Sequence, residues 1–107
     1  METKKLSKIT NKLKAGLSEI LADCLENVYL YGSQARGEAQ TGSDIDVIII
    51  IKGDFDYDEM LDQTLDLVAE LSLKYDVVIS RVFVSKEDYN NEMSPFLMNV
   101  RREAVPI

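Results

Sequence analysis

The segment YGSQARGEAQTGSDIDVIIII, which spans residues 31–51, decides the fold of this chain. Its second half, from Asp44 to Ile51, is a β-branched run too apolar for a strand with one face in water, so it predicts a central strand of a sheet. Its first half ends a short apolar run, Val28 to Tyr31, at Gly32 and passes into a turn-rich stretch. This order predicts a strand, a tight turn, a brief helix and a loop that leads into the buried strand.

The part of the chain before this segment has its apolar residues at intervals of three and four. This spacing predicts an amphipathic helix from about Thr3 to Leu25. The residues on this stripe are Leu6, Ile9, Leu13, Leu17, Ile20, Leu21 and Cys24. Such a helix needs a sheet or another helix to cover its apolar face, and the place of Cys24 on the stripe predicts a core residue rather than a reactive thiol.

Helical and β-rich stretches alternate after the segment. Apolar residues return to helical spacing from Tyr57 to Lys74, and a third β-rich run extends from Asp76 to Val84. Two more helices are expected, at about Lys86 to Glu92 and from Pro95 to Glu103. In the second, Ser94 is the predicted N-cap, with proline at the first helical position.

Length and composition limit the class of protein. A chain of 107 residues fits one domain, so we expect residues 1–107 to form a small mixed sheet of at least three strands packed by helices, in the α/β (α+β) class. The absence of histidine excludes imidazole catalysis and a histidine-bound zinc site. A net charge of −7 argues against nucleic acid as a direct partner. One cysteine and no apolar run long enough to span a bilayer predict a cytoplasmic protein without a membrane segment.

Acidic residues stand where the buried strand begins. Asp44 and Asp46 are two apart and therefore project from one face of a strand. Two such carboxylates resist desolvation, which makes Mg²⁺ the natural companion, although a simple solubilising role at a strand start is the alternative. Asp76 opens the next β-rich run, where it would share a face with Val78 and Ser80. All three acids converge if the two strands are neighbours; otherwise Asp76 is a boundary residue that faces water.

The turn before the acids has the features of a phosphate site. Gly32 lets a phosphate approach the backbone, and the amides that follow, with the Ser33 hydroxyl, can bind its oxygens. Arg36, one turn further on, can reach a phosphate or pair with an acid. Ser43 can touch phosphate or cap a turn, and turn formation is the reading we favour.

The spacing of these elements resembles a known family. Gly32-Ser33, ten intervening residues and then Asp44-Ile45-Asp46 resemble the signature of the polymerase-β-type nucleotidyltransferases. The string GSQARGEAQTGSDIDV and the ending SPFLMNVRREAVPI resemble the minimal nucleotidyltransferases (MNT proteins) that pair with HEPN toxins. The resemblance spans nearly the whole chain and implies a polymerase-β-like fold.

The resemblance also implies a reaction and a set of roles. Asp44, Asp46 and Asp76 would bind two Mg²⁺ ions, and Gly32 and Ser33 would hold the β- and γ-phosphates of an NTP. Asp76 would be both a ligand and the proton acceptor. The implied activity is transfer of AMP from ATP to a tyrosine of a HEPN ribonuclease toxin, for which this chain would be the antitoxin.

Two alternatives stay open at this point. The chain could be a binding module that neutralises the toxin by covering it, with an idle nucleotide site. It could also be an antibiotic-modifying nucleotidyltransferase, whose cationic substrates suit an acidic surface, although such relatives carry an additional domain. The base, the acceptor, the number of nucleotides added and the choice between homo- and hetero-oligomers are not determined by the sequence.

Overall fold

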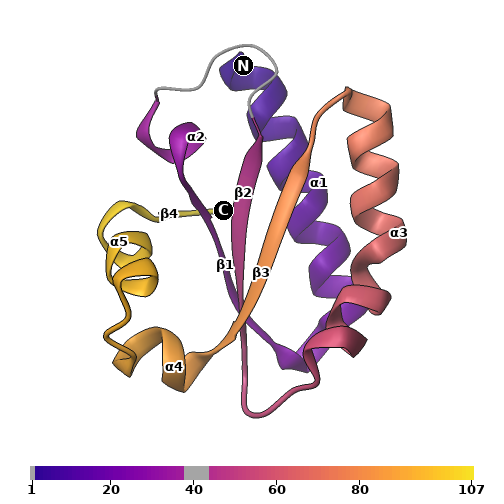
Figure 1. Ribbon diagram of the computed structural model, residues 1–107. Coiled ribbons are helices and arrows are strands. Elements are labelled where there is room, and N and C mark those ends of the chain that lie inside the picture. The colour runs from indigo at the N-terminus through magenta and orange to yellow at the C-terminus, as the bar shows by residue number, and fades with distance from the viewer. Residues whose placement is uncertain (1, 38–43) are drawn as a thin grey trace.

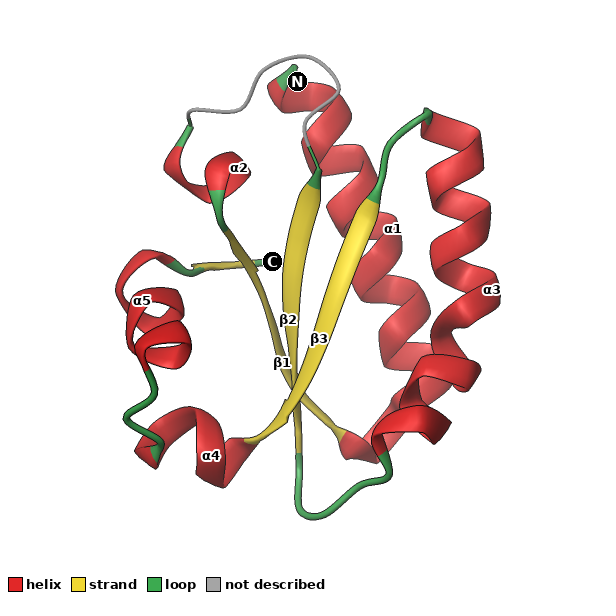
Figure 2. Cartoon of the chain, viewed as in Figure 1, coloured by secondary structure: helices red, strands yellow, loops and turns green. Residues whose placement is uncertain are grey.

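The computed structural model describes residues 2–37 and 44–107 (Figures 1 and 2). Ser43 lies outside the described residues, so its predicted role is not addressed by the structure. In chain order the elements are α1 (Thr3–Leu21), a 3₁₀ turn (Ala22–Cys24), β1 (Leu25–Tyr31), α2 (Ser33–Arg36), β2 (Ile45–Ile51), α3 (Tyr57–Tyr75), β3 (Ile79–Ser85), α4 (Lys86–Asn91), α5 (Pro95–Glu103) and β4 (Val105–Pro106).

The strands form one mixed sheet in the order β3-β2-β1-β4. β1 lies antiparallel to β2 and to β4, whereas β2 and β3 are parallel and are joined by the crossover helix α3. The β-branched run is therefore an interior strand, as its apolar sequence predicts. Val47, Ile48 and Ile49 are fully buried although they point to opposite faces, which is the expected behaviour of a strand covered on both sides.

Helices cover the two faces of the sheet unequally. α1 and α3 lie together over one face, and α4 and α5 lie over the other (Figure 1). The α1/α3 side holds the larger apolar core, to which β2 contributes Ile49 and Ile51. The α5 side holds a smaller cluster in which Ile48 and Ile50 pack against Leu97 and Val100.

The structure corrects the predicted end of the first helix. α1 stops at Leu21 rather than Leu25, because the chain turns through Ala22, which has a φ of 48°, and enters β1 at Leu25. Cys24 is therefore exposed in the 3₁₀ turn, and the prediction that it lies in the core is wrong. The three- and four-residue spacing places a side chain on the apolar face only within the helix, and Cys24 lies beyond its end.

The structure also corrects the start of the third strand. β3 begins at Ile79, and Asp76 is the C-cap of α3 in a left-handed conformation, with a φ of 54°. The Val77 N–H donates to the Ser72 carbonyl, which closes the end of the helix. Helix α5, by contrast, has the predicted bounds, and the Ser94 hydroxyl accepts from the Leu97 N–H at 3.2 Å as the predicted N-cap.

Candidate active site

The predicted phosphate turn and the acid pair meet where β1 ends and β2 begins. Tyr31 on β1 pairs with Asp46 on β2, and Gly32 follows directly. Gly32 has a φ of 76° and a ψ of −156°, a region that only glycine adopts readily. A Cβ at this position would lie 2.6 Å from Asp46 Oδ2. Glycine is therefore required both by the backbone and by the approach of the carboxylate.

The two acids differ in their exposure to solvent. Asp44 directly precedes β2 and is exposed, whereas Asp46 is half-buried on the face of the sheet that also carries Ile48. Burial raises the pKa of the Asp46 carboxyl, and the charge of Asp44 raises that pKa further. The Arg36 guanidinium acts in the opposite direction. The charged form of Asp46 is thus held in a place that disfavours it.

Asp76 does not join this pair in the structure. The residue of β3 that pairs with Asp46 is Ser80, and Asp76 is an exposed helix-cap residue outside the strand. The prediction that Asp76 shares a strand face with Val78 and Ser80 is therefore wrong. Within residues 2–37 and 44–107, no group of three acidic or cysteine side chains is arranged to hold a metal ion.

The two acids at the start of β2 nevertheless fit a hard divalent cation. The two acids would offer the cation carboxylate oxygens, the ligands that Mg²⁺ prefers. A bound cation would also offset the cost of burying the Asp46 charge and its repulsion from Asp44, the two effects that raise the pKa of Asp46. Asp44 and Asp46 are thus the residues of this site that would hold such an ion, and a role of Asp76 beside them remains a prediction.

A third acid lies on the other side of the turn. The Glu103 carboxylate, at the end of α5, accepts a hydrogen bond from the Gly32 N–H at 3.1 Å. It also accepts one from Arg36 Nη1 at 3.0 Å. Arg36 thus takes the salt-bridge alternative that its sequence position allows. Sequence reasoning missed Glu103, because a single acid in the last turn of a helix carries no motif.

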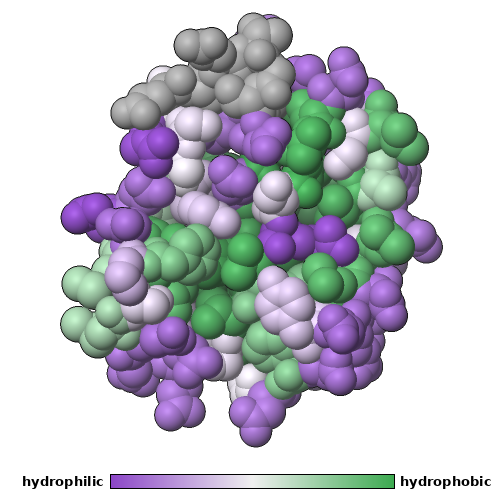
Figure 3. Space-filling view, viewed as in Figure 1, coloured by the Kyte–Doolittle hydropathy of each residue, from purple (hydrophilic) through white to green (hydrophobic). Residues whose placement is uncertain are grey.

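Aromatic side chains of β1 contact those of α4 and α5. Tyr31 packs edge-on against Phe96 with ring centroids 5.7 Å apart, and Tyr29 stacks on Tyr89 at 5.4 Å. Light green side chains gather over α5 in the space-filling view (Figure 3), where Phe96 and Met98 are each about half exposed. An apolar surface therefore adjoins the candidate site.

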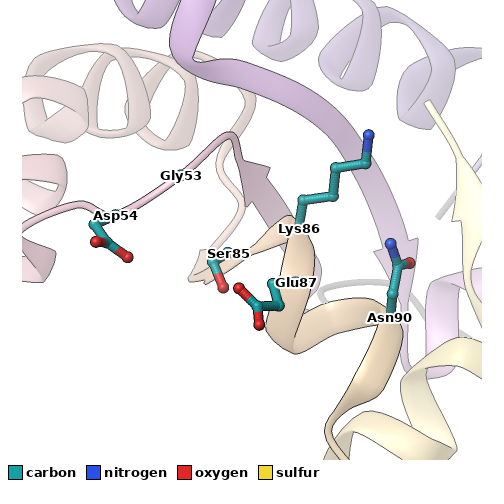
Figure 4. Close-up of a pocket in the computed structure, with 6 residues that line it drawn as sticks. All are labelled: Gly53, Asp54, Ser85, Lys86, Glu87 and Asn90. Carbon is teal, nitrogen blue, oxygen red and sulfur yellow. The ribbon is translucent and has the colours of Figure 1, made fainter.

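A pocket of about 320 Å³ lies at the opposite end of the strands (Figure 4). It is lined by Gly53, Asp54, Ser85, Lys86, Glu87 and Asn90. These residues follow the ends of β2 and β3, whereas Asp44 and Asp46 stand at the start of β2. The pocket is therefore separate from the candidate active site.

Comparisons with known proteins identify the family of this chain. The family described as polymerase beta, nucleotidyltransferase matches residues 8–94. The chain belongs to this family and is a nucleotidyltransferase.

Two proteins of Methanocaldococcus jannaschii are similar in sequence. "Putative protein adenylyltransferase MJ0604" is 39% identical over 80 residues, which cover 74% of each chain. "Putative protein adenylyltransferase MJ0141" is 37% identical over 78 residues, covering 73% of this chain and 78% of that protein. The similarity to both relatives extends over about three quarters of this chain.

Solved structures share the fold. A toxin–antitoxin complex with AMP-PNP has a TM-score of 0.64 at 20% identity, covering 90% of this chain and 69% of that chain. A structure described as that of a "putative minimal nucleotidyltransferase" has a TM-score of 0.58 at 26% identity, with 95% of both chains covered. The predicted mixed α/β fold of the minimal nucleotidyltransferases is thereby confirmed.

Proposed function

We propose that this chain transfers AMP from ATP to a hydroxyl group of a partner protein. The observation that carries the proposal is the approach of the Asp46 carboxylate to Gly32, at 2.6 Å from the position of a Cβ. It brings Asp46 of the acid pair against the Gly32-Ser33 turn, which supports the proposal that the pair binds metal beside a turn that binds phosphate. The names of the two archaeal relatives support a protein as the acceptor.

The proposed roles follow from where these side chains lie. Asp44 and Asp46 would hold Mg²⁺, two ions by the family resemblance, which when bound activate the hydroxyl and neutralise the leaving pyrophosphate. The Gly32-Ser33 turn would hold the β- and γ-phosphates through the amides that follow Gly32 and through the Ser33 hydroxyl, because the Gly32 N–H itself donates to Glu103. Arg36 would add positive charge beside them, and Ser43 remains a predicted phosphate contact.

The transfer itself makes one bond and breaks another. The acceptor oxygen bonds to the α-phosphorus, the bond from that phosphorus to the β-phosphate oxygen breaks, and pyrophosphate leaves. The hydroxyl proton passes to a carboxylate, for which the family resemblance indicates Asp76. Because Asp76 caps α3 and lies outside strand β3 in this structure, an Asp76→Asn variant is the direct test of that role.

The partner we propose is a toxin of the HEPN ribonuclease family. The proposed acceptor is the hydroxyl of one of its tyrosines. Structural neighbours of this chain occur in toxin–antitoxin complexes, which supports a toxin as the acceptor. The exposed apolar side chains of Phe96 and Met98 lie beside the candidate site and suit contact with a protein surface.

The occurrence of those neighbours in complexes also favours a second candidate, neutralisation by binding alone. An Asp44→Asn/Asp46→Asn double variant separates the two. Catalytic neutralisation predicts that this variant loses protection against the toxin at equal abundance. Full protection would establish the binding module instead.

The direct test of the proposal is a labelling experiment. The purified chain is incubated with Mg²⁺, the toxin candidate and ATP, GTP, CTP or UTP labelled at the α-phosphate. We expect label on the partner protein from ATP, and none with the double variant. No label from any nucleotide, together with a stable complex, would overturn the enzymatic proposal.

A further inference from the structure

We propose that Glu103 is a positioning residue of the nucleotide site, which ties the Gly32-Ser33 turn and Arg36 to helix α5 and so keeps the phosphate-binding groups in place. This inference rests on the proposed function. It concerns a residue outside the motif, 71 positions along the chain from Gly32.

Both oxygens of the Glu103 carboxylate are engaged. Oε1 accepts from the Gly32 N–H, and Oε2 accepts from the Arg36 guanidinium at 3.0 Å. The Glu103 side chain is 24% exposed and its contact with Gly32 is partly shielded from water, whereas the Arg36 side chain is 43% exposed. A carboxylate held at both oxygens fixes direction as well as distance between the turn and the helix.

Helix α2, which Glu103 contacts through Arg36, is too short to be stable by itself. α2 has four residues, Ser33 to Arg36, far fewer than a helix needs to be stable alone. Ordering such a segment on ligand binding would reduce affinity by the conformational entropy it loses. A contact that orders it beforehand removes that loss.

Helix α5 is a suitable anchor because it is packed into the sheet. Leu97 and Val100 are buried against Ile48 and Ile50, and the chain continues into β4, where Val105 pairs with Leu30. Glu103 therefore transmits the position of the packed core to the turn. A mobile surface residue would not have this effect.

Charge links the same groups to the acid pair. The Arg36 guanidinium and the Gly32 N–H hold the pKa of Glu103 below its usual value, so Glu103 is ionised at neutral pH. The Arg36 charge also lowers the pKa of Asp46. Arg36 thus acts on both Glu103 and Asp46, and its ion pair with Glu103 limits where its charge can lie.

The test measures the dissociation constant of AMP-PNP in the presence of Mg²⁺ by calorimetry. Glu103→Ala is expected to raise Kd by about tenfold, the effect of losing roughly one charge-assisted contact. Glu103→Gln keeps an oxygen that can accept from Gly32 but loses the charge that holds Arg36, so an intermediate Kd is expected. Circular dichroism and thermal unfolding report whether each variant is folded, and the Gln variant serves if the Ala variant is not.

The chain offers a matched control in Glu26. Its side chain is 23% exposed and pairs with Lys86 at 3.3 Å, at the opposite end of the sheet. Glu26→Ala removes a comparable ion pair and should leave Kd unchanged. The Glu103→Ala/Arg36→Ala double variant should raise Kd by a factor smaller than the product of the factors for the two single variants, because Glu103 acts partly through Arg36.

The outcomes separate the inference from the function on which it rests. If the unaltered chain binds Mg²⁺ and AMP-PNP and the Glu103 variants bind equally well or more tightly, the positioning role is wrong and the function stands. If the unaltered chain binds no nucleotide, the proposed function fails and this inference fails with it.

Discussion

Asp46 is the residue whose environment is most at odds with its own chemistry. It is half-buried next to a second carboxylate, and the Arg36 charge opposes the resulting rise in its pKa. A residue chosen for stability alone would not be charged here. Its position makes sense when a cation is bound, which is the function proposed for it.

Asp46→Asn should stabilise the chain at neutral pH when a chelator removes divalent ions. The pKa of Asp46 is raised above 3.8 in the folded state, so the folded state binds its proton more tightly than the unfolded state does. The unaltered chain therefore loses stability as pH rises from about 3.8 through the folded pKa, and the Asn variant does not. Urea unfolding of both at pH 7 and at pH 3.5 measures this difference, which should disappear at the lower pH. A less stable variant at pH 7 would contradict the reasoning.

The turns that end the strands differ in what they permit. Gly32 ends β1 and Gly53 follows β2, and both have a positive φ, 76° and 72°. Only Gly32 is crowded, by the Asp46 carboxylate; a Cβ on Gly53 would meet no atom within 4 Å. The β1 turn is thus shaped by the site, and the β2 turn by backbone conformation alone.

Gly53→Ala should lower the free energy of unfolding by about 1–2 kcal/mol, the cost of a left-handed alanine. Gly32→Ala should cost at least about 1 kcal/mol more, because it adds a glycine-only conformation and a clash. Urea denaturation measures both values. Binding of AMP-PNP should be impaired in the Gly32 variant alone, and equal behaviour of the two variants would show that the approach of Asp46 to Gly32 is unimportant.

At the scale of the whole molecule, the site lies at the start of the interior strand β2, where Asp44 is exposed and Asp46 is half-buried. α1 and α3 cover one face, while α4 and α5 pack on the other against Ile48 and Ile50, further along β2 than Asp46 (Figure 1). The strand that carries the acids is at the same time the most buried strand. A ligand at its start should therefore stabilise the fold as a unit. The described part of the chain contains no helix long and apolar enough to cross a membrane.

Mg²⁺ with AMP-PNP should raise the melting temperature of the unaltered chain. A ligand present at 100 times its Kd stabilises the folded state by about 2.7 kcal/mol. For a domain of this size that corresponds to a rise in Tm on the order of 10 °C. Scanning calorimetry with and without ligand measures it, and the Asp44→Asn/Asp46→Asn variant should show little change. An equal shift in that variant would place nucleotide binding elsewhere.

Much of the fold could be predicted because the deciding signals are local. The apolar run of β2 indicates an interior strand wherever it occurs, and Ser94 followed by proline indicates a helix start without reference to the rest of the chain. The Gly-Ser turn and the acid pair could be predicted for the same reason. Their catalytic roles remain predictions, which the labelling experiment tests.

The sequence by itself determined the class of fold, the central strand, and the adjacency of Gly32 to the acid pair, since each depends on residues close together in the chain. Only the tertiary structure decided that Asp76 caps α3 instead of opening β3, and that Glu103 reaches Gly32 and Arg36. Both depend on long-range geometry: where helix α3 ends its last turn, and where the packing of α5 on Ile48 and Ile50 places its final residue. Spacing along the chain contains no record of such contacts, because they arise only when separate elements pack.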